Sequence, residues 1–354
     1  MQIVIADSEF QRLGLIENAN VIWTSRYYKT GDFELYMPAT ADNLALIEQG
    51  KYVINDDDED NIGVIEDLTI EGNAEDGDMM TVTGRFALGH YLSKRIVPTQ
   101  TQLYGNVELQ VRSLVYDNIV EPVDKNRKIP FIVLGARDES ITEKIELQTT
   151  GDNLLEKVEE ICESKGIGMR MPLRDGLLYF EMYKGIDRSY KQEDNSWIVF
   201  SDDYDNLQDV AYTKTTTEAK NFAYVAGEGE GTARMIVTTY NTEEEPTGAD
   251  RSEVWVDQRN ASSNDGEISE SELEAQLKED GNQELSTITE AFDGTVLFDN
   301  FDYGKPDDGG AVYMGDMVTI QKTKWNGIYI NARIVEVIES SDENGTERAV
   351  TFGV

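Results

Sequence analysis

The alternation of apolar and polar residues near the start of the chain is the feature that most restricts the fold. Residues 33–37 (FELYM) place an apolar side chain at every second position until Pro38 ends the run. A period of two puts alternate side chains on one face of a β-strand, so this run predicts a strand with one buried face. Residues 20–28 have a similar texture, and the turn-forming sequence 30–32 (TGD) separates the two runs. Together they predict a β-hairpin.

Further short runs of β-forming residues fill the rest of this part of the chain. They are punctuated by two acidic turns, and they lie at residues 2–6, 52–54, 62–70 and 79–83. Short helices are expected at residues 41–49 and 86–93. The regular spacing of short strands predicts a small antiparallel barrel or sandwich over residues 1–95.

Residues 96–195 have a mixed pattern of helix and strand. Apolar residues recur at helical spacing in segments 107–119 and 153–165, and Gly166 follows the second segment. Both segments predict amphipathic helices, and the glycine ends the second one. Two strand-like runs follow and predict a hairpin packed against a helix face. This part of the chain is therefore expected to form an α+β module.

From residue 196 to residue 354 the β pattern returns. Runs rich in β-branched and aromatic residues predict strands along this part of the chain. One helix with few apolar side chains is expected near residues 269–291, with a bend near Asp280-Gly281. The expected fold class is thus β-rich α+β, with β-rich parts at residues 1–95 and 196–354 and the α+β module at residues 96–195 between them.

The charge of the chain excludes some classes of partner. Its 354 residues include 31 Lys and Arg against 69 Asp and Glu, which gives a formal net charge of −38. A field this negative repels phosphates, so nucleic-acid binding on a basic face and adhesion to an anionic membrane are not expected. The sequence starts without the basic segment of a secretion signal, and no apolar run reaches the length of a membrane span, so no membrane insertion is expected.

The residues that most often carry chemistry are scarce. The single histidine, His90, lies in a predicted helix without a partner motif, so a surface or capping role is favoured over catalysis. The single cysteine, Cys162, cannot form an internal disulfide, which fits synthesis in a reducing cytoplasm. It lies between Glu160 and Glu163, whose charges disfavour a reactive thiolate. We predict no catalytic residue, no cofactor and no metal site, and therefore no enzyme.

Two local motifs suggest ligands without completing the required pattern. The run Asp56–Asp60 has the alternate-aspartate spacing that begins an EF-hand loop, but Asn61 and Asp67 stand where glycine and glutamate are needed. A solvated turn is favoured, and cation binding is left open. Residues 227–231 (GEGEG) suggest a phosphate loop, but the two glutamates would repel phosphate. A flexible hairpin turn or bulge is the favoured interpretation.

Eight segments spread over the whole chain share one resemblance. They are residues 23–38 (WTSRYYKTGDFELYMP), 83–86 (TGRF), 92–95 (LSKR), 126–130 (NRKIP), 185–188 (GIDR), 200–207 (FSDDYDNL), 221–231 (NFAYVAGEGEG) and 313–320 (YMGDMVTI). Together and in this order they resemble a family of tail proteins of long-tailed phages. The family is that of baseplate hub proteins, which are equivalent to the N-terminal structural part of tail-associated lysins and similar in fold to the hub of contractile tails.

This resemblance implies a structural role at the tip of a phage or prophage tail. It implies a homotrimeric ring in which each subunit contributes two tube-like antiparallel β-barrel domains, one near residues 1–95 and one within residues 196–354. The implied partners are a distal tail or tail tube ring, the tape measure protein, and a separate tip fibre, receptor-binding protein or lysin. Assembly would take place in the host cytoplasm. The family supplies no catalytic residues, and the resemblance leaves open whether the tail contracts.

The same resemblance gives the acidity of the chain a role. A lumen lined by carboxylates would repel DNA phosphates, so the genome would pass through without specific binding. Contacts between subunits would use strand edges and buried aromatic side chains. Trp23, Tyr27, Tyr28 and Phe33 could serve such contacts or fill a barrel core, and the sequence leaves both interpretations open.

Two other classes of function stay as alternatives. A cell-wall hydrolase would use a pair of carboxylates, and it predicts cleavage of purified cell walls by the isolated chain. A carbohydrate-binding adhesin would need its aromatic side chains in an exposed strip rather than in a core.

Overall fold

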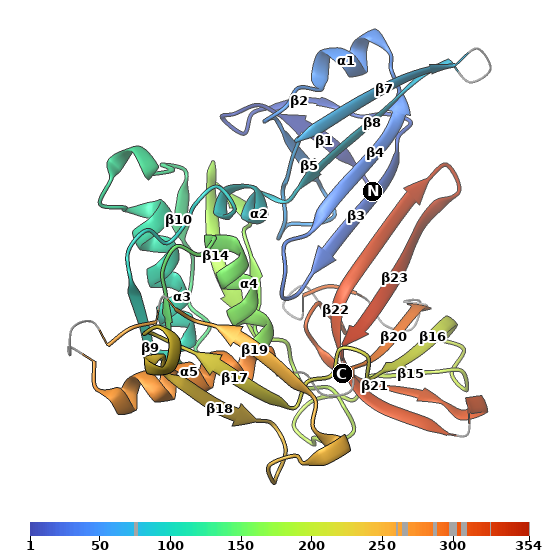
Figure 1. The fold of residues 1–354 in the computed structure, drawn as a ribbon. Coiled ribbons are helices and arrows are strands. Elements are labelled where there is room, and N and C mark those ends of the chain that lie inside the picture. Colours follow the sequence, from blue (N-terminus) through green and yellow to red (C-terminus); the bar gives the residue numbers. More distant parts are fainter. Residues whose placement is uncertain are drawn as a thin grey trace.

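The computed structural model of the chain is built mainly of β-strands, with a few helices between them (Figure 1). It describes residues 1–73, 77–259, 261–263, 268–285, 289–296, 303–305, 310–325 and 327–353. The expected β-rich α+β class is confirmed.

The first part of the chain forms two sheets that face each other. One sheet has the order β2-β1-β5-β6, with β1 Ile3–Ala6, β2 Arg12–Leu15, β5 Tyr52–Asn55 and β6 Gly63–Val64. The other contains β3 Asn20–Arg26, β4 Asp32–Pro38, β7 Asp67–Asn73 and β8 Gly77–Arg85, and the short helices are α1 Ala41–Leu46 and α2 Ala87–Leu92. The expected hairpin is β3 paired with β4, in which Trp23 lies opposite Phe33. Both side chains are buried in the core between the sheets, because the alternation turns one face of the hairpin inward.

The second sheet does not end at the first part of the chain. It continues into the last part as a ten-stranded sheet of order β16-β20-β23-β22-β3-β4-β8-β7. The added strands are β16 Leu207–Thr215, β20 Thr289–Val296, β22 Ile328–Asp342 and β23 Gly345–Gly353. The remaining two strands of the ten are β21 Met317–Lys322, which also pairs with β22, and β15 Val199–Ser201, which pairs with β21. Strand β3 pairs with β22 through six consecutive residue pairs, from Arg26 opposite Glu336 to Val21 opposite Ser341. Since this pairing occupies the edge of β3, the described strands form open sheets rather than a barrel closed within one chain.

The middle part has the expected mixture of helices and strands. Its strands are β9 Thr101–Asn106, β10 Ile132–Leu134, β11 Lys144–Thr149, β12 Gly168–Arg170, β13 Leu173–Arg174 and β14 Leu177–Tyr183, and its helices are α3 Val107–Val115 and α4 Leu154–Lys165. Helix α4 begins at Asn153, whose side chain accepts hydrogen bonds from the first free backbone amides, and it ends at Gly166 in the left-handed conformation (φ 68°). Helix α3 stops earlier than the predicted residue 119 and continues as a wider π-helical turn at Tyr116–Val120.

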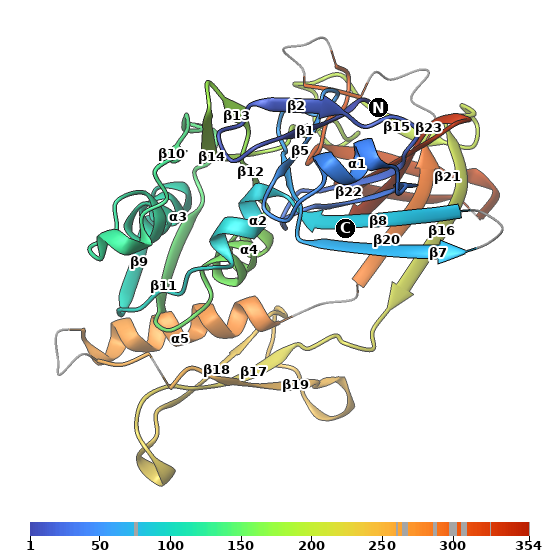
Figure 2. The same cartoon turned by 90° about the horizontal axis from the view of Figure 1, so that it is seen from above.

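One sheet and one helix of the last part stand apart from the ten-stranded sheet (Figure 2). Strands β17 Phe222–Ala226, β18 Ile236–Tyr240 and β19 Glu253–Asp257 form a three-stranded sheet of order β18-β17-β19. Helix α5 Glu270–Glu284 covers one face of that sheet and packs against β11 on its other side. Single 3₁₀ turns lie at Lys125–Arg127, Gly231–Ala233, Gly248–Asp250 and Thr323–Trp325.

The helix expected near residues 269–291 is confirmed in part. It begins with Ser269 and Glu272 in a capping box and runs without a break through Gly281. A Cβ at Gly281 would lie 2.5 Å from Val225, so the glycine permits close packing on β17 rather than a bend. The helix ends at Glu284, and residues 289–291 belong to β20 instead. The expected residues 286–288 lie outside the described part.

Candidate functional site

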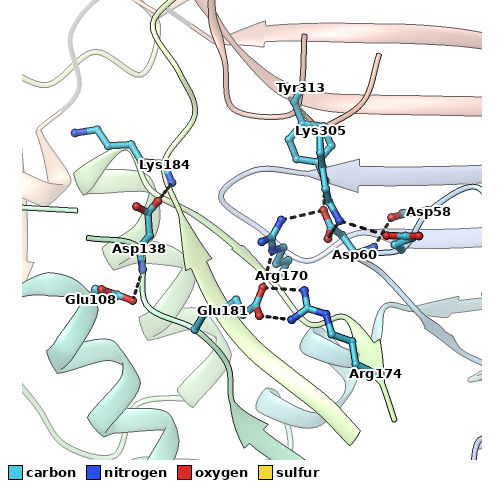
Figure 3. A network of polar contacts seen from close by, with 12 residues as sticks. Asp58, Asp60, Glu108, Asp138, Arg170, Arg174, Glu181, Lys184, Lys305 and Tyr313 are labelled. Carbon is cyan, nitrogen blue, oxygen red and sulfur yellow. Dashed lines mark hydrogen bonds and ion pairs between the residues drawn. The ribbon is translucent and has the colours of Figure 1, made fainter. Parts of the chain in front are cut away.

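The candidate site is a buried polar junction where the first, middle and last parts of the chain meet (Figure 3). Its centre is Asp60, in the loop between β5 and β6, with 3% of the residue exposed. The Asp60 carboxylate lies 2.6 Å from Lys305 Nζ and 3.3 Å from Arg170 Nη1, and it accepts a hydrogen bond from the Tyr313 hydroxyl. A buried carboxylate needs such counter-charges, because removing it from water is costly. One side chain thus joins β12 to two separate segments of the last part.

The network continues from Arg170 into the middle part. Arg170 Nε lies 3.0 Å from Glu181 on β14, and Arg174 Nη1 lies 2.5 Å from the other oxygen of the same carboxylate. Burial alone would raise the pKa of Glu181, but the hydrogen bond from Arg174 and the charge of Arg170 together lower it. Glu181 therefore keeps its charge and orients both guanidinium groups toward the junction.

The rest of the aspartate run also has fixed partners. Asp56 pairs with Arg12 at 2.5 Å on the outside of the loop. Asp58 accepts hydrogen bonds from Trp23 Nε1 at 2.7 Å and from Asn61 at 2.8 Å, and burial raises the pKa of its carboxyl. The favoured interpretation of a solvated turn is therefore wrong for Asp58 and Asp60, because residues from other parts of the chain supply cations and hydrogen-bond donors to them. Within the described residues, no group of three or more acidic, histidine or cysteine side chains is arranged to hold a metal ion.

A cavity of about 330 Å³ lies beside this network. Asp58, Arg170, Tyr183, Tyr313 and Arg348 are among the residues that line it. Arg170 also lies over the Tyr183 ring, with its guanidinium carbon 5.1 Å from the ring centre. The lining comes from all three parts of the chain, so a change in their relative positions would change the cavity.

A second junction lies around the buried side chain of Tyr27. Its hydroxyl accepts a hydrogen bond from the Gly185 amide at 3.0 Å and lies 3.3 Å from the Gly166 carbonyl oxygen. Burial raises the pKa of Tyr27 to about 12, so the hydroxyl stays protonated. A Cβ at Gly185 would lie 1.8 Å from the Gly315 carbonyl oxygen. The two backbones therefore approach at a distance that only glycine at position 185 allows.

Asp316 fixes the same crossing by hydrogen bonds. Its carboxylate accepts from the Ile186 amide at 2.8 Å and from Arg188 Nε at 3.0 Å. The Tyr313 amide also donates to it, at 3.0 Å. These bonds connect the segment after β14 to the turn before β21, so polar contacts hold the middle and last parts together.

The middle part has a polar network of its own next to this junction (Figure 3). The fully buried Glu108 accepts a hydrogen bond from the Asp138 amide at 3.1 Å and pairs with Arg137 at 3.2 Å. Asp138 in turn accepts a hydrogen bond from the Lys184 amide at 2.9 Å. This network fixes the end of β14, from which the chain crosses to the last part.

His90 and Cys162, the sequence candidates for chemistry, occupy structural positions. His90 Nδ1 lies 2.6 Å from Glu66, whose other contacts include Arg85 at 2.8 Å. Burial lowers the pKa of His90, whereas the pKa of Glu66 is about 2 because hydrogen bonds from Arg85 and His90 outweigh its burial. Cys162 is fully buried in α4, and burial raises the pKa of its thiol. Neither residue is placed as a nucleophile or a general base.

The aromatic and glycine-rich candidates have packing roles. Trp23, Tyr27 and Phe33 are almost completely buried, which favours the core interpretation for these three, while Tyr28 is partly buried beside Tyr27. The segment 227–231 joins β17 to β18 as the expected hairpin connection. Its glycines at positions 229 and 231 have φ values of +96° and +57°, a left-handed conformation that glycine adopts more readily than other residues.

The sequence did not single out the residues that form the junction. Arg170 and Glu181 are charged residues within otherwise apolar strands, and this pattern is a signal for buried pairs. Lys305 and Tyr313 carry no such local signal, because their partner Asp60 lies far away in the chain.

A family model matches almost the complete chain. Residues 2–354 match the family described as Siphovirus ReqiPepy6 Gp37-like protein. The chain belongs to this family. It is a family of siphovirus tail proteins, so the resemblance noted in the sequence is confirmed and the chain is a component of a phage tail.

Solved structures of other tail proteins have a fold similar to that of this family member. A tail protein from Neisseria meningitidis MC58 is 14% identical with a TM-score of 0.58, covering 100% of this chain and 96% of that one. The 43 kDa tail protein of prophage MuSo2 from Shewanella oneidensis is 11% identical with a TM-score of 0.55, covering 99% and 98%. The prophage tail protein gp18 from Listeria monocytogenes EGD-e is 13% identical with a TM-score of 0.52, covering 100% and 94%. At these identities the likeness shows the fold.

No curated protein matches the sequence. Among the described residues, the helices are too short or too polar for any of them to cross a membrane.

Proposed function

We propose that this tail protein is a non-enzymatic hub at the tail tip, in which three copies form a ring that caps the tail tube and opens for DNA. Residues 1–95 and the strands of residues 196–354 that join the ten-stranded sheet would be its tube-like domains, and residues 96–195 the module between them. The ring would contact a distal tail or tail tube ring, the tape measure protein, and separate tip fibres, receptor-binding proteins or lysins. It would assemble in the host cytoplasm.

The observation that carries this proposal is the ten-stranded sheet shared by the first and last parts of the chain. Its main run of strands ends at β7 and β16, each of which pairs on one side in the described residues, and β15 is a third end strand that pairs with β21. An open sheet edge tends to pair with another chain. Because the edges at β7 and β16 come from different parts of the chain, pairing of β7 with β16 of a neighbour is heterologous, and such contacts close into a ring when the rotation fits.

The face of this sheet that turns away from the cores has the chemistry expected of a DNA passage. Glu34, Asp67 and Glu71 are exposed on it, interleaved with threonines of β7 and β8. Its Arg26 pairs with Asp32 at 2.5 Å and with Glu336 at 2.6 Å, so its charge is neutralised. A wall of this kind repels phosphates and offers them few cations, so DNA would slide past it.

The buried junction would be the place where the ring changes shape. Interfaces between the parts of one chain that use ion pairs and hydrogen bonds can separate and reform more easily than apolar cores. The contacts of Asp60, Arg170 and Asp316 have this character. They would hold the parts in the closed state and rearrange when the tail receives its signal.

The mass and shape of the assembled protein test this proposal. Native mass spectrometry at several concentrations should give the mass of a trimer, and negative-stain images should show a ring with a central opening or plug. The same measurements are repeated with the neighbouring tail protein added, because a weak trimer can dissociate into monomers when that protein is absent. A monomer that persists at high concentration with that protein present would overturn the proposal.

A further inference from the structure

The three-stranded sheet β18-β17-β19 has one covered face and one open face. On its inner face Ala223, Val225 and Val237 pack against α5 in a small core of their own. Because side chains alternate along a strand, the next residues in each strand point the other way. These outward residues include Trp255, Tyr240 and Ile236, which are 54%, 42% and 50% exposed. Their exposure shows that the described part of the chain leaves these positions on the two outer strands accessible.

The aromatic side chains of the open face lie side by side across the strands. Tyr224 lies opposite Trp255 in the parallel pair β17–β19, and Phe222 lies opposite Tyr240 in the antiparallel pair β17–β18. The rings of Phe222 and Tyr240 are stacked, with 6.5 Å between their centres and 13° between their planes. Neighbouring strands are about 4.8 Å apart, so the four rings lie close together on this face. Phe222 is only 2% exposed, so the rings open to a partner are those of Trp255, Tyr240 and the partly buried Tyr224.

Arg251 holds the strip in a fixed shape. Its guanidinium carbon lies 3.4 Å from the centre of the Phe222 ring, and Nη2 donates a hydrogen bond of 2.9 Å to the Tyr224 hydroxyl. Glu245 and Glu253 accept from the same guanidinium at 2.8 and 2.7 Å. The rings are therefore positioned before any partner arrives, which lowers the entropic cost of binding. Glu253 and the exposed Thr238 place hydrogen-bonding groups between the rings.

We propose that this open face, which we call the aromatic strip, binds a neutral polysaccharide chain. The face of a pyranose ring is lined with C–H groups that carry a small positive charge, and these pack on the electron-rich faces of aromatic rings. The ring edges of the sugar carry hydroxyl groups, which the interleaved carboxylate and hydroxyl side chains can hydrogen-bond. The net charge of −38 disfavours anionic polymers on the same surface. A tail protein meets the polysaccharides of a cell surface, and such a strip would add a weak contact to them.

Binding of the full-length chain to a panel of glycans tests the proposal. The panel holds neutral hexose and N-acetylhexosamine oligosaccharides, with sulfated and uronic-acid glycans for comparison. Binding to neutral members and not to the anionic ones is expected, followed by titration calorimetry on the best one. Trp255→Ala and Tyr240→Ala should each weaken that binding about tenfold or more, because each removes one stacking surface. Trp255→Phe should keep part of it.

The chain offers a matched control for the tryptophan. Trp197 is also 54% exposed, but it lies outside the aromatic strip, so Trp197→Ala should leave the affinity unchanged. Equal losses in the Trp197 and Trp255 variants, or no binding to any neutral member by the wild-type chain, would overturn the proposal. A change in the number of copies per assembly in the Trp255→Ala variant, measured by native mass spectrometry, would also overturn the proposal, because the strip would then be a contact between copies. The result does not depend on the proposed ring, whose test is the wild-type mass.

Discussion

Arg26 on β3 and Glu336 on β22 form an ion pair of 2.6 Å at one end of the pairing that joins the first and last parts of the chain. Asp32 approaches the same guanidinium at 2.5 Å from β4. The ion pairs of Arg26 thus link three neighbouring strands on the face that turns away from the cores. It stabilises the seam between the two parts and, at the same time, removes a free positive charge from that face.

Replacement of Asp60 by asparagine should loosen the junction. The change keeps the shape of the side chain but leaves Lys305 and part of Arg170 without their counter-charge in a buried site. Loss of one partner from a buried pair costs about 3 kcal/mol of the free energy of unfolding. Urea denaturation followed by tyrosine and tryptophan fluorescence measures it. The control is Asp57→Asn, whose side chain is 60% exposed, and equal effects of the two changes would contradict the role of Asp60.

Replacement of Gly185 by alanine should separate the middle and last parts. The new Cβ would lie 1.8 Å from the Gly315 carbonyl oxygen, which is backbone and cannot rotate away. We expect a loss of about 3 kcal/mol in the free energy of unfolding, at the upper end for overpacking. Thermal unfolding and limited proteolysis between β14 and β15 would detect it. Gly72→Ala serves as the control because its Cβ meets the end of the Asp78 side chain, and a Gly185 variant as stable as that control would show that the close approach is not required.

Reversal of charge on the proposed DNA wall should make the protein retain DNA. Glu34→Lys combined with Glu71→Lys places new cations on exposed strand positions, and cations release counterions from DNA on binding. Gel shift of double-stranded DNA at about 50 mM salt should show binding by this variant and none by the wild-type protein. Glu243→Lys with Glu244→Lys, in an exposed loop on another part of the molecule, is the control. Similar DNA binding by both variants would mean that the net charge of the protein, rather than the charge of this sheet face, determines whether DNA binds.

The packing of α5 against the middle part of the chain should weaken as the pH rises. Burial raises the pKa of Asp280 from its ordinary 3.8 to about 8; Lys157 opposes the shift, while Glu160, Glu279 and Asp152 add to it. Between these two values the folded protein keeps a proton that the unfolded chain releases, so the stability contributed by the neutral carboxyl is lost as the pH rises through about 8. Below pH 3.8 the contribution is complete.

The variant Asp280→Asn isolates this effect. Denaturation of the wild-type protein and the variant at about pH 5 and pH 8 should show that the wild-type protein loses more free energy of unfolding over this interval. Glu274→Gln, at an exposed position of α5, should behave like the wild-type protein. Identical pH dependence in the wild-type protein and the Asp280 variant would contradict the assignment.

Local periodicity predicted most of the individual elements. The hairpin of β3 and β4, helix α4 and the β-rich class all follow from repeats of two or 3.6 residues, together with the glycine that ends α4. The pairing of β3 with β22 had no local signal, because it depends on residues that lie far apart in the chain. The end of α5 was misplaced for a related reason, since residues 289–291 prefer their partners on β16 and β23 to another helical turn.

The junction was harder to predict than the fold. The run Asp56–Asp60 consists of acidic residues, and acidic residues are mostly exposed to water in folded proteins. Its burial is decided by Arg170 and Lys305, which approach only after the three parts have come together. The resemblance to tail proteins could be established from ordered sequence segments, whereas the residues that connect the parts required the structure.

The shared sheet also sets an order of events during synthesis. Strand β3 leaves the ribosome early, but its partner β22 follows more than three hundred residues later in the sequence. Until then the edge of β3 is open to incorrect partners, which is a known risk for slow, long-range pairings. The middle part shares a core with the first part, which has already been synthesised, so the two can fold together during this interval. A chain interrupted before β22 would lack this seam, so the fold itself separates finished subunits from fragments before they reach a growing tail.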